Sequence, residues 1–166
     1  MYQQYYNILN ADEYDELNKI VYGLKWVYGA TSNINPSETK FWYSDLAQFP
    51  FFGSFFQKIE SITNKKFKLV QVYANGQTLG QDGTWHYDSD AVGGFTFIYY
   101  WNYHEDPSVV GETYFMVDGI PESIIPIQNS GVFFNHNVLH KGMAPRKEFN
   151  SLRVSIAFKL IEITNT

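Results

Sequence analysis

The chain has 166 residues and a formal charge of -5, contains no cysteine, and is 45% hydrophobic, with 14 Phe, 13 Tyr and 4 Trp. This length and aromatic content fit one folded domain, residues 1–166, and exclude a disordered chain. Without cysteine, disulfides, thiolate-bound zinc and iron–sulfur clusters are excluded, so any metal must be held by His, Asp or Glu.

The charged and apolar residues also limit the partners. Only 12 residues are Lys or Arg, and they form no dense run that could neutralise many phosphates, so a nucleic acid is disfavoured. The sequence opens without a charged and then apolar leader, and no segment approaches the roughly 20 apolar residues that cross a bilayer. We therefore expect a soluble, cytoplasmic protein with no membrane partner, and the sequence leaves its oligomeric state open.

Residues 1–66 are predicted to form a helical buttress together with the first strands. Asn10 is a suitable N-cap for a first helix, whose apolar residues recur at helical spacing. These apolar residues are Tyr14, Leu17, Val21 and Leu24. A second short helix is expected around Phe55 and Ile59, after Pro50, and both helices are expected to lay an apolar face on a sheet.

From Phe67 onward, short β-rich runs separated by turn residues replace the helical pattern. The runs are Phe67–Tyr73, Thr84–Asp88, Phe95–Trp101, Thr113–Val117, Ser123–Ile127, Gly131–Phe134 and Leu152–Ile161. Because no helix lies between them, they predict two facing antiparallel sheets or a barrel rather than a parallel βαβ sheet. The predicted fold class is mainly β with flanking helices (α+β), with a jelly-roll core in residues 67–161.

The last of these runs has two different faces. Val154, Ile156, Phe158 and Leu160 alternate with Arg153, Ser155, Ala157 and Lys159. Successive residues of a strand point to opposite sides, so the apolar set is predicted to pack in the core. The other set carries small residues and an arginine, as the wall of a polar cavity would.

His86 and Asp88 are candidate metal ligands because they are two residues apart in a run with strand character. Both side chains then leave the same face, and an imidazole and a carboxylate can share one ion. His140, in a distant segment, would complete a set of two histidines and one carboxylate, which leaves the opposite metal positions open and is typical of reactive iron(II) sites. His136 is a competing candidate that the context of Leu139–Gly142 disfavours.

The order of these motifs resembles that of a known family. His86-Tyr87-Asp88 is followed by a strand run, Gly111-Glu112-Thr113, a glycine-aromatic strand, Leu139-His140-Lys141-Gly142 and Arg153-Val154-Ser155. This series is similar to that of the 2-oxoglutarate and iron(II)-dependent oxygenases of the prolyl 4-hydroxylase type, over about residues 67–160. The resemblance implies a double-stranded β-helix, a cupin-like jelly roll, with His86, Asp88 and His140 as the iron ligands of the catalytic site.

The same resemblance assigns the residues that bind the cosubstrate. Arg153 occupies the place of the basic residue that pairs with the C5 carboxylate of 2-oxoglutarate, and its planar guanidinium suits a carboxylate. Tyr100 matches a tyrosine that donates to the same carboxylate, and Tyr73 matches a tyrosine near the cosubstrate. Val110 stands where the family's Gly-Gly-Glu-Thr turn has its first glycine, which leaves the geometry of that turn open.

The implied reaction is hydroxylation of a C–H bond by dioxygen, with conversion of 2-oxoglutarate to succinate and CO2. Iron(II) is the implied cofactor, 2-oxoglutarate the cosubstrate, and ascorbate an optional reductant. The first substrate hypothesis is a prolyl residue in a peptide or protein, because the loops expected around the opening suit an extended peptide. A free amino acid or another small molecule is the second hypothesis, and the acidic balance disfavours methylated nucleobases.

Two interpretations from other classes stay open on the residues alone. A jelly-roll binding module without turnover would have no need of a cosubstrate anchor such as Arg153. A cupin-type isomerase or epimerase would require a more histidine-rich metal set or a His/Tyr acid–base pair. Activity that depends on 2-oxoglutarate separates the three interpretations.

Overall fold

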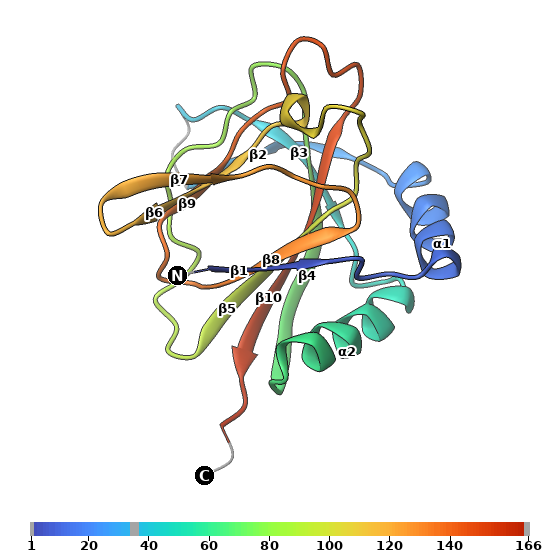
Figure 1. Ribbon diagram of the computed structural model, residues 1–166, viewed down its shortest axis with the longest axis vertical. Coiled ribbons are helices and arrows are strands. Elements are labelled where there is room, and N and C mark those ends of the chain that lie inside the picture. Colours follow the sequence, from blue (N-terminus) through green and yellow to red (C-terminus); the bar gives the residue numbers. More distant parts are fainter. Residues whose placement is uncertain (1, 34–36, 165–166) are drawn as a thin grey trace.

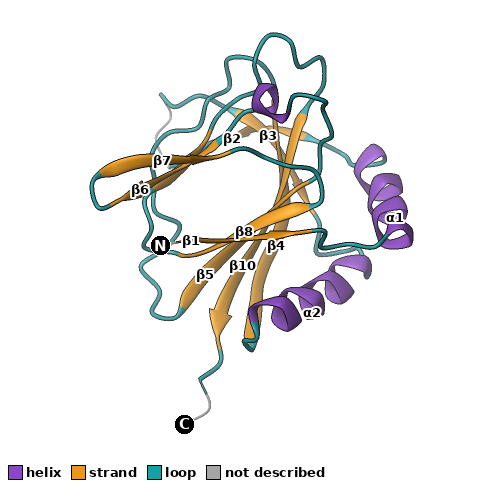
Figure 2. Ribbon diagram, viewed as in Figure 1, coloured by secondary structure: helices purple, strands orange, loops and turns teal. Residues whose placement is uncertain are grey.

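The computed structural model describes residues 2–33 and 37–164 of the chain (Figure 1). The elements in chain order are β1 (Tyr2–Tyr6), α1 (Ala11–Tyr22), β2 (Val27–Ala30), β3 (Phe41–Asp45), α2 (Phe51–Thr63), β4 (Phe67–Gln77), β5 (Gly94–Tyr100), the 3-10 helix η1 (Pro107–Val110), β6 (Thr113–Val117), β7 (Ile120–Ile124), β8 (Ser130–Asn135), β9 (His140–Gly142) and β10 (Arg153–Glu162). Strands dominate, and two helices flank them (Figure 2). The predicted mainly β fold class is confirmed.

The strands form two antiparallel sheets, which build the jelly-roll core. The larger sheet has the order β1-β8-β5-β10-β4-β3-β2, and the smaller has the order β7-β6-β9. β10 therefore lies inside the large sheet, hydrogen-bonded to β5 on one side and to β4 on the other. Figure 1 shows the small sheet across from the large one, with both helices at the other side of the molecule.

The two helices cover one face of the large sheet. The main hydrophobic core joins Leu17 of α1 and Phe55 and Ile59 of α2 to strand residues. The strand residues come from alternate positions of β4, β5 and β10: Val72, Ala74, Phe97, Tyr99, Val154, Ile156, Phe158 and Leu160. Each large side chain that is fully buried contributes roughly 1.5–3 kcal/mol. The inward set predicted for the last strand is confirmed, and its alternate set faces the other side of the sheet.

Both predicted helices are confirmed. The side chain of Asn10 accepts a hydrogen bond from the backbone N–H of Glu13, and the Glu13 carboxylate accepts one from the backbone N–H of Asn10. This capping box satisfies two donors at the start of α1. Glu13 also forms an ion pair with Lys58 of α2, which links the two helices. α2 begins after Pro50 and ends at Thr63, and the capping residue Asn64 that follows has a left-handed φ of 53°.

The predicted strand Thr84–Asp88 is wrong. In place of a strand there is one isolated antiparallel bridge, between His86 and His140. The reason is that β9 has only three residues, and its other edge is hydrogen-bonded to β6. The backbone N–H of Thr84 instead donates to the side chain of Ser32, so the segment has too few backbone partners to form a strand.

The predicted strand Ser123–Ile127 lies too far along the chain, because β7 spans Ile120–Ile124. Asp118 and Gly119 have positive φ values of 50° and 80° and form a two-residue turn. Such turns are typical of tight hairpins, and this one lets Val117 pair directly with Ile120. The strand therefore begins directly after the turn.

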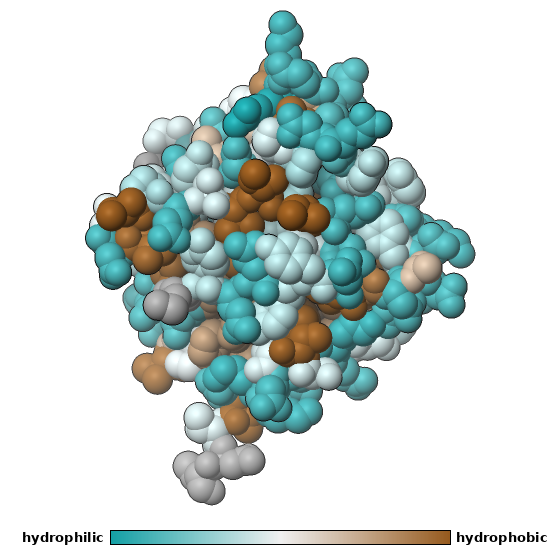
Figure 3. All heavy atoms as spheres, in the orientation of Figure 1, coloured by the Kyte–Doolittle hydropathy of each residue, from teal (hydrophilic) through white to brown (hydrophobic). Residues whose placement is uncertain are grey.

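One face of the molecule shows how its hydrophilic and hydrophobic side chains are distributed. The face seen in Figure 3 is mainly hydrophilic, with small, separate hydrophobic clusters, which is usual for folded proteins. Within residues 2–33 and 37–164, no helix combines the length and apolar character that a membrane crossing requires.

Candidate active site

A cavity of about 620 Å³ lies on the face of the large sheet opposite the two helices. Alternate residues of β10, from Arg153 to Lys159, line this cavity, as do alternate residues of β4, from Tyr73 to Gln77. Residues of the small sheet, including His140, contribute to the wall as well. The cavity wall predicted from the last strand is therefore present.

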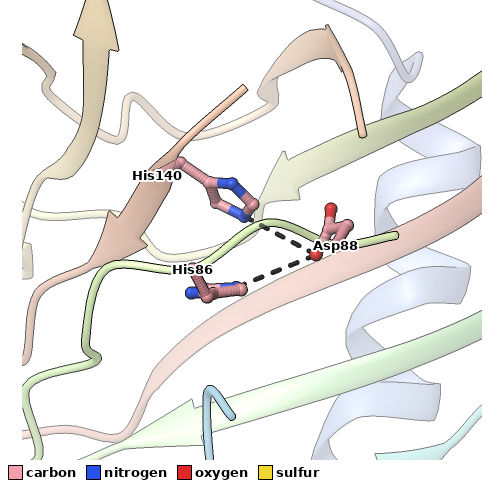
Figure 4. A group of neighbouring side chains, drawn as sticks. All are labelled: His86, Asp88 and His140. Atoms are coloured by element: carbon pink, nitrogen blue, oxygen red, sulfur yellow. Dashed lines mark ion pairs between the residues drawn. The ribbon is translucent and has the colours of Figure 1, made fainter. Parts of the chain in front are cut away.

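His86, Asp88 and His140 converge inside this cavity (Figure 4). The Nε2 atoms of His86 and His140 lie 3.8 and 3.7 Å from the same oxygen of Asp88, Oδ1. The three donor atoms all lie within 4.8 Å of one another. The backbone positions them, because His86 and His140 exchange two N–H···O bonds of 3.0 Å and the N–H of Asp88 donates to His136.

The backbone also decides which ring nitrogen of each histidine can bind a metal. Nδ1 of His86 lies 2.8 Å from the carbonyl oxygen of Thr84, and Nδ1 of His140 lies 2.9 Å from that of Val138. A carbonyl oxygen only accepts, so Nδ1 must carry the proton in both rings. Each Nε2 then has a free lone pair, the arrangement usual for metal-binding histidines.

The charges of the three residues also suit a cation. Burial lowers the pKa of His140 to about 4, so its imidazole is neutral at pH 7. Burial alone would raise the pKa of Asp88, but the positive charge of Lys159, the charge of His140 once it is protonated at low pH, and hydrogen bonds from Lys159 and Thr96 outweigh the effect of burial. The pKa of Asp88 falls to about 2. At pH 7 the site therefore presents a cation with the ionised carboxylate of Asp88 and the neutral imidazole of His140.

The donor set fits iron(II). A divalent ion at about 2.1–2.2 Å from each of three donors requires donors roughly 3.0–3.7 Å apart, close to the separations of 3.8 and 3.7 Å between the two Nε2 atoms and Oδ1 of Asp88. Two histidine nitrogens and one carboxylate oxygen on one side of an ion form the facial set used by non-haem iron(II) oxygenases. His86, Asp88 and His140 would hold such an ion and leave its remaining positions facing the cavity.

Arg153 lies buried in the wall of the same cavity, at the start of β10. Its guanidinium donates to the carbonyl oxygen of Gly111 at 3.0 Å, to Oε1 of Gln77 at 2.7 Å and to Oγ1 of Thr113 at 3.3 Å. Within the described part of the chain, no carboxylate forms an ion pair with it, and Glu112 pairs with Arg146 instead. A buried charge without a counter-ion is costly, so this site calls for an anion.

Comparison with known proteins gives no match to a family model and none to a curated sequence. Solved structures do match. An oxidoreductase of the 2OG-Fe(II) oxygenase family from Burkholderia pseudomallei is 11% identical, with a TM-score of 0.74 over 96% of this chain and 84% of that one. A viral collagen prolyl hydroxylase from Paramecium bursaria Chlorella virus-1, in complex with 2-oxoglutarate, is 17% identical, with a TM-score of 0.70 over 98% and 96%.

The chain has the fold of the 2-oxoglutarate and iron(II) oxygenases. The resemblance predicted from the motifs is confirmed at the level of the fold. HygX from Streptomyces hygroscopicus, with nickel, 2-oxoglutarate and hygromycin B bound, has the same fold, at 11% identity and a TM-score of 0.69 over 99% of this chain and 84% of that one. Proteins with this fold thus include both a collagen prolyl hydroxylase and a protein with hygromycin B bound.

The two tyrosines expected near the cosubstrate have different surroundings. Tyr73 lines the cavity, where its ring packs against Tyr43 at 5.4 Å, and burial raises its pKa. Tyr100 is buried beneath the wall, and its hydroxyl donates to Oγ1 of Thr113 at 2.8 Å. Thr113 also accepts from Arg153, so Tyr100 and the guanidinium are linked through the hydroxyl group of Thr113. The assignments of Tyr73 and Tyr100 to the cosubstrate stay predictions.

His136, the competing ligand candidate, lies outside the group of three donors. Its backbone carbonyl accepts from the N–H of Asp88, and its ring packs over Gly94 at the start of β5. A Cβ atom on Gly94 would lie 2.2 Å from Nδ1 of His136, so glycine is required at this position. His136 thus helps to position the segment that carries Asp88.

Three residues in or beside the cavity were not assigned a role from the sequence: Thr113 and Lys159, which line it, and Thr96, which contacts Asp88. Thr113 accepts hydrogen bonds from Arg153 and Tyr100, and its own hydroxyl proton remains to be donated. Thr96 and Lys159 both contact the Asp88 carboxylate. For Lys159, the only indication in the sequence was strand alternation, which placed it on the same face as Arg153. Its contact with Asp88 could not be predicted, because the sequence does not show which strands pair with the last one.

Proposed function

We propose that this protein is an iron(II)- and 2-oxoglutarate-dependent oxygenase that hydroxylates a C–H bond, most simply as a single domain over residues 1–166. One observation carries the proposal. A single cavity contains both the three converging donors and the buried guanidinium of Arg153, which has no ion-pair partner in the described residues. A metal-binding module alone would need only the first of these features.

His86, Asp88 and His140 would hold the metal through two Nε2 atoms and one carboxylate oxygen. When bound together, iron(II) and 2-oxoglutarate supply the oxidising power that places one atom of dioxygen in a C–H bond and releases succinate and CO2. The residues of the chain would bind the metal and the cosubstrate, orient them, and shield the site from water. The neutral state of His140 at pH 7, caused by its burial, leaves Nε2 ready to bind without loss of a proton.

Arg153 would orient the cosubstrate. Of its five N–H donors, three are already engaged with Gly111, Gln77 and Thr113, which leaves two that a carboxylate could accept together. The three existing bonds fix the guanidinium plane before any ligand arrives. Preorganisation of this kind lowers the entropy lost on binding. The hydroxyl proton of Thr113 would serve the same carboxylate.

The walls around the metal site favour an uncharged substrate. Among the residues lining the cavity, the charged ones are Asp88, Arg153 and Lys159, and Asp88 and Lys159 pair with each other. The remaining lining is largely aromatic, aliphatic and neutral polar, and includes Phe41, Tyr43, Val70, Gln71, Tyr73, Tyr87 and Ser89. Val70 and Tyr87 are 58% and 57% exposed, so they lie on the open side.

We therefore propose a prolyl residue of an extended peptide or protein as the substrate. A prolyl ring is apolar and uncharged, and it packs well on aromatic side chains such as Tyr43 and Tyr87. A neutral small molecule is the second candidate, because a cavity of about 620 Å³ lies in the size range of small-molecule sites. With Arg153 assigned to the cosubstrate and Asp88 paired with Lys159, the described lining residues offer no further unpaired charge to a polyanion or a strongly cationic substrate.

The decisive test is anaerobic titration of the iron(II)-loaded protein with 2-oxoglutarate, followed by visible absorption. We expect the weak metal-to-ligand charge-transfer band of a bound 2-oxo acid, and a higher 2-oxoglutarate concentration at half-saturation in Arg153→Ala. Arg146→Ala, which removes an exposed arginine paired with Glu112, is the matched control and should titrate as the wild type does. A folded, iron-loaded wild type without the band would leave the binding-module interpretation.

The substrate is tested separately, with peptides that differ only in having proline or alanine at one position. We expect succinate formation and the mass gain of one oxygen atom with the proline peptide alone. Uncharged small molecules, tested in parallel, would take its place if they supported succinate formation and the peptides did not. His86→Ala and Asp88→Ala should abolish succinate formation in folded protein.

A further inference from the structure

Lys159 lies in the cavity with its ammonium group against the metal site. Its Nζ atom is 2.5 Å from Oδ2 of Asp88 and 3.1 Å from Oγ1 of Thr96. Thr96 itself donates to Oδ2 at 2.5 Å. The side chains of Asp88 and Lys159 are only 6% and 15% exposed, so water screens this ion pair poorly.

The two oxygens of the Asp88 carboxylate therefore have different partners. Oδ1 faces the Nε2 atoms of His86 and His140 at 3.8 and 3.7 Å (Figure 4). Oδ2 is engaged on the other side, by the ammonium group of Lys159 and the hydroxyl group of Thr96. Rotation of the carboxylate toward a metal through Oδ2 would break two charge-assisted hydrogen bonds in a buried site.

Strand pairing fixes this arrangement. Lys159 on β10 and Thr96 on β5 are direct cross-strand partners, so both side chains leave the same face of the large sheet. The ring of Tyr73, on the neighbouring strand β4, lies 5.9 Å from Nζ of Lys159 and adds a cation–π contact. The ammonium group thus has fixed neighbours on three sides.

We propose that Lys159, together with Thr96, is a positioning residue that keeps Asp88 a one-oxygen metal ligand. This inference rests on the proposed function of the site. If His86, Asp88 and His140 each supplied one donor atom, the other positions of the metal would stay open to the cosubstrate and dioxygen. A second oxygen from Asp88 would compete for these positions, and Lys159 prevents that by holding Oδ2.

Lys159 is the positive charge that directly neighbours the Asp88 carboxylate. Arg153, at the start of β10, would instead pair with the far carboxylate of the cosubstrate, so the two cations serve different groups.

The test uses Co²⁺ as a spectroscopic probe, because its visible absorption responds to the number of ligand atoms. Metal-free wild type, Lys159→Met, Lys159→Arg and Thr96→Val would each be titrated with Co²⁺ and then with 2-oxoglutarate without oxygen. Lys65→Met is the control, because Lys65 forms an ion pair with Glu162, at the far end of β10 from Arg153.

We expect Lys159→Met to change the Co²⁺ spectrum and to weaken 2-oxoglutarate binding by about ten- to a hundredfold, as removal of other groups that support metal ligands does. Lys159→Arg should restore most of the wild-type behaviour, and Thr96→Val should change the spectrum in the same direction but less. Lys65→Met should match the wild type in both measurements. Because Thr96→Val keeps the buried charges paired, it tests the idea even if Lys159→Met fails to fold.

A folded Lys159→Met with the wild-type Co²⁺ spectrum and 2-oxoglutarate affinity would overturn the inference and leave the proposed function standing. Spectra of Thr96→Val identical to those of the wild type would count against it in the same way. A wild type that bound neither Co²⁺ nor 2-oxoglutarate would overturn the proposed function, and this inference with it.

Discussion

At the scale of single residues, the candidate site depends on the protonation of His140. The ring is buried next to Asp88, with Nδ1 against a backbone carbonyl, and its burial holds the pKa near 4. In an unfolded chain the pKa would be about 6.5. Between these two values the unfolded chain binds a proton that the folded, metal-free protein does not bind at His140.

This difference predicts a pH-dependent stability for the metal-free protein. Its free energy of unfolding should fall as the pH is lowered from about 6.5 to about 4, by roughly 2–3 kcal/mol from His140 alone. Urea denaturation at several pH values would measure the effect. His140→Gln should flatten the profile in this range. An unchanged profile in that variant would show that other groups cause the loss.

The three residues that converge in the candidate metal site could be predicted from the sequence, but not all of their contacts. His86, Asp88 and His140 follow from residue type and order, although the strand expected around Asp88 is absent. Backbone bonds to His140 and His136 give the convergence that the strand was expected to give. The contact of Lys159 with Asp88 depends on the register between β10 and β5, which local sequence does not encode.

At the scale of elements, the burial of a strand determines whether it can be predicted from the sequence. β4, β5 and β10 have one apolar face under the helices, and this produces the alternation that predicts strands. β1 and β2 lie at the two edges of the large sheet and are mostly exposed, so their residues carry no such alternation. Their positions within residues 1–66 were therefore not predicted.

The capping box of α1 gives a prediction at this scale. Asn10→Ala should lower the free energy of unfolding by about 1 kcal/mol, because the backbone N–H of Glu13 loses its acceptor. Asn10→Asp keeps an acceptor oxygen and should remain close to the wild type. Chemical denaturation of the three proteins measures both effects, and equal losses in the two variants would contradict the capping role.

At the scale of the whole molecule, the cavity joins two ligand sites through one strand. The guanidinium of Arg153, at the start of β10, could pair with an anion, while Lys159 further along the strand contacts Asp88, a proposed metal ligand. The metal and the 2-oxo acid would bind next to each other, and each would reduce the charge imbalance that the other meets. Binding of the two should therefore be coupled.

This coupling should appear in thermal denaturation with Mn²⁺ as an air-stable substitute for iron(II). At about 100 times its dissociation constant, a ligand stabilises by about 2.7 kcal/mol, or roughly 5–10 °C in Tm at this chain length. We expect 2-oxoglutarate to raise the Tm strongly only when Mn²⁺ is present. Arg153→Gln should keep the increase caused by Mn²⁺ and lose the one caused by 2-oxoglutarate. Equal 2-oxoglutarate effects with and without metal would contradict the coupling.

The central place of β10 has a consequence for how the protein folds. β10 follows β4 and β5 in the chain by long stretches, yet it must insert between them. Pairings between such distant segments form slowly and late. Until β10 has inserted, neither Arg153 nor Lys159 is in its final position, even if His86 and His140 already lie close together. In a partly folded chain the cavity wall that carries Arg153 and Lys159 is therefore missing, and we expect such a chain neither to bind a 2-oxo acid nor to begin oxidation.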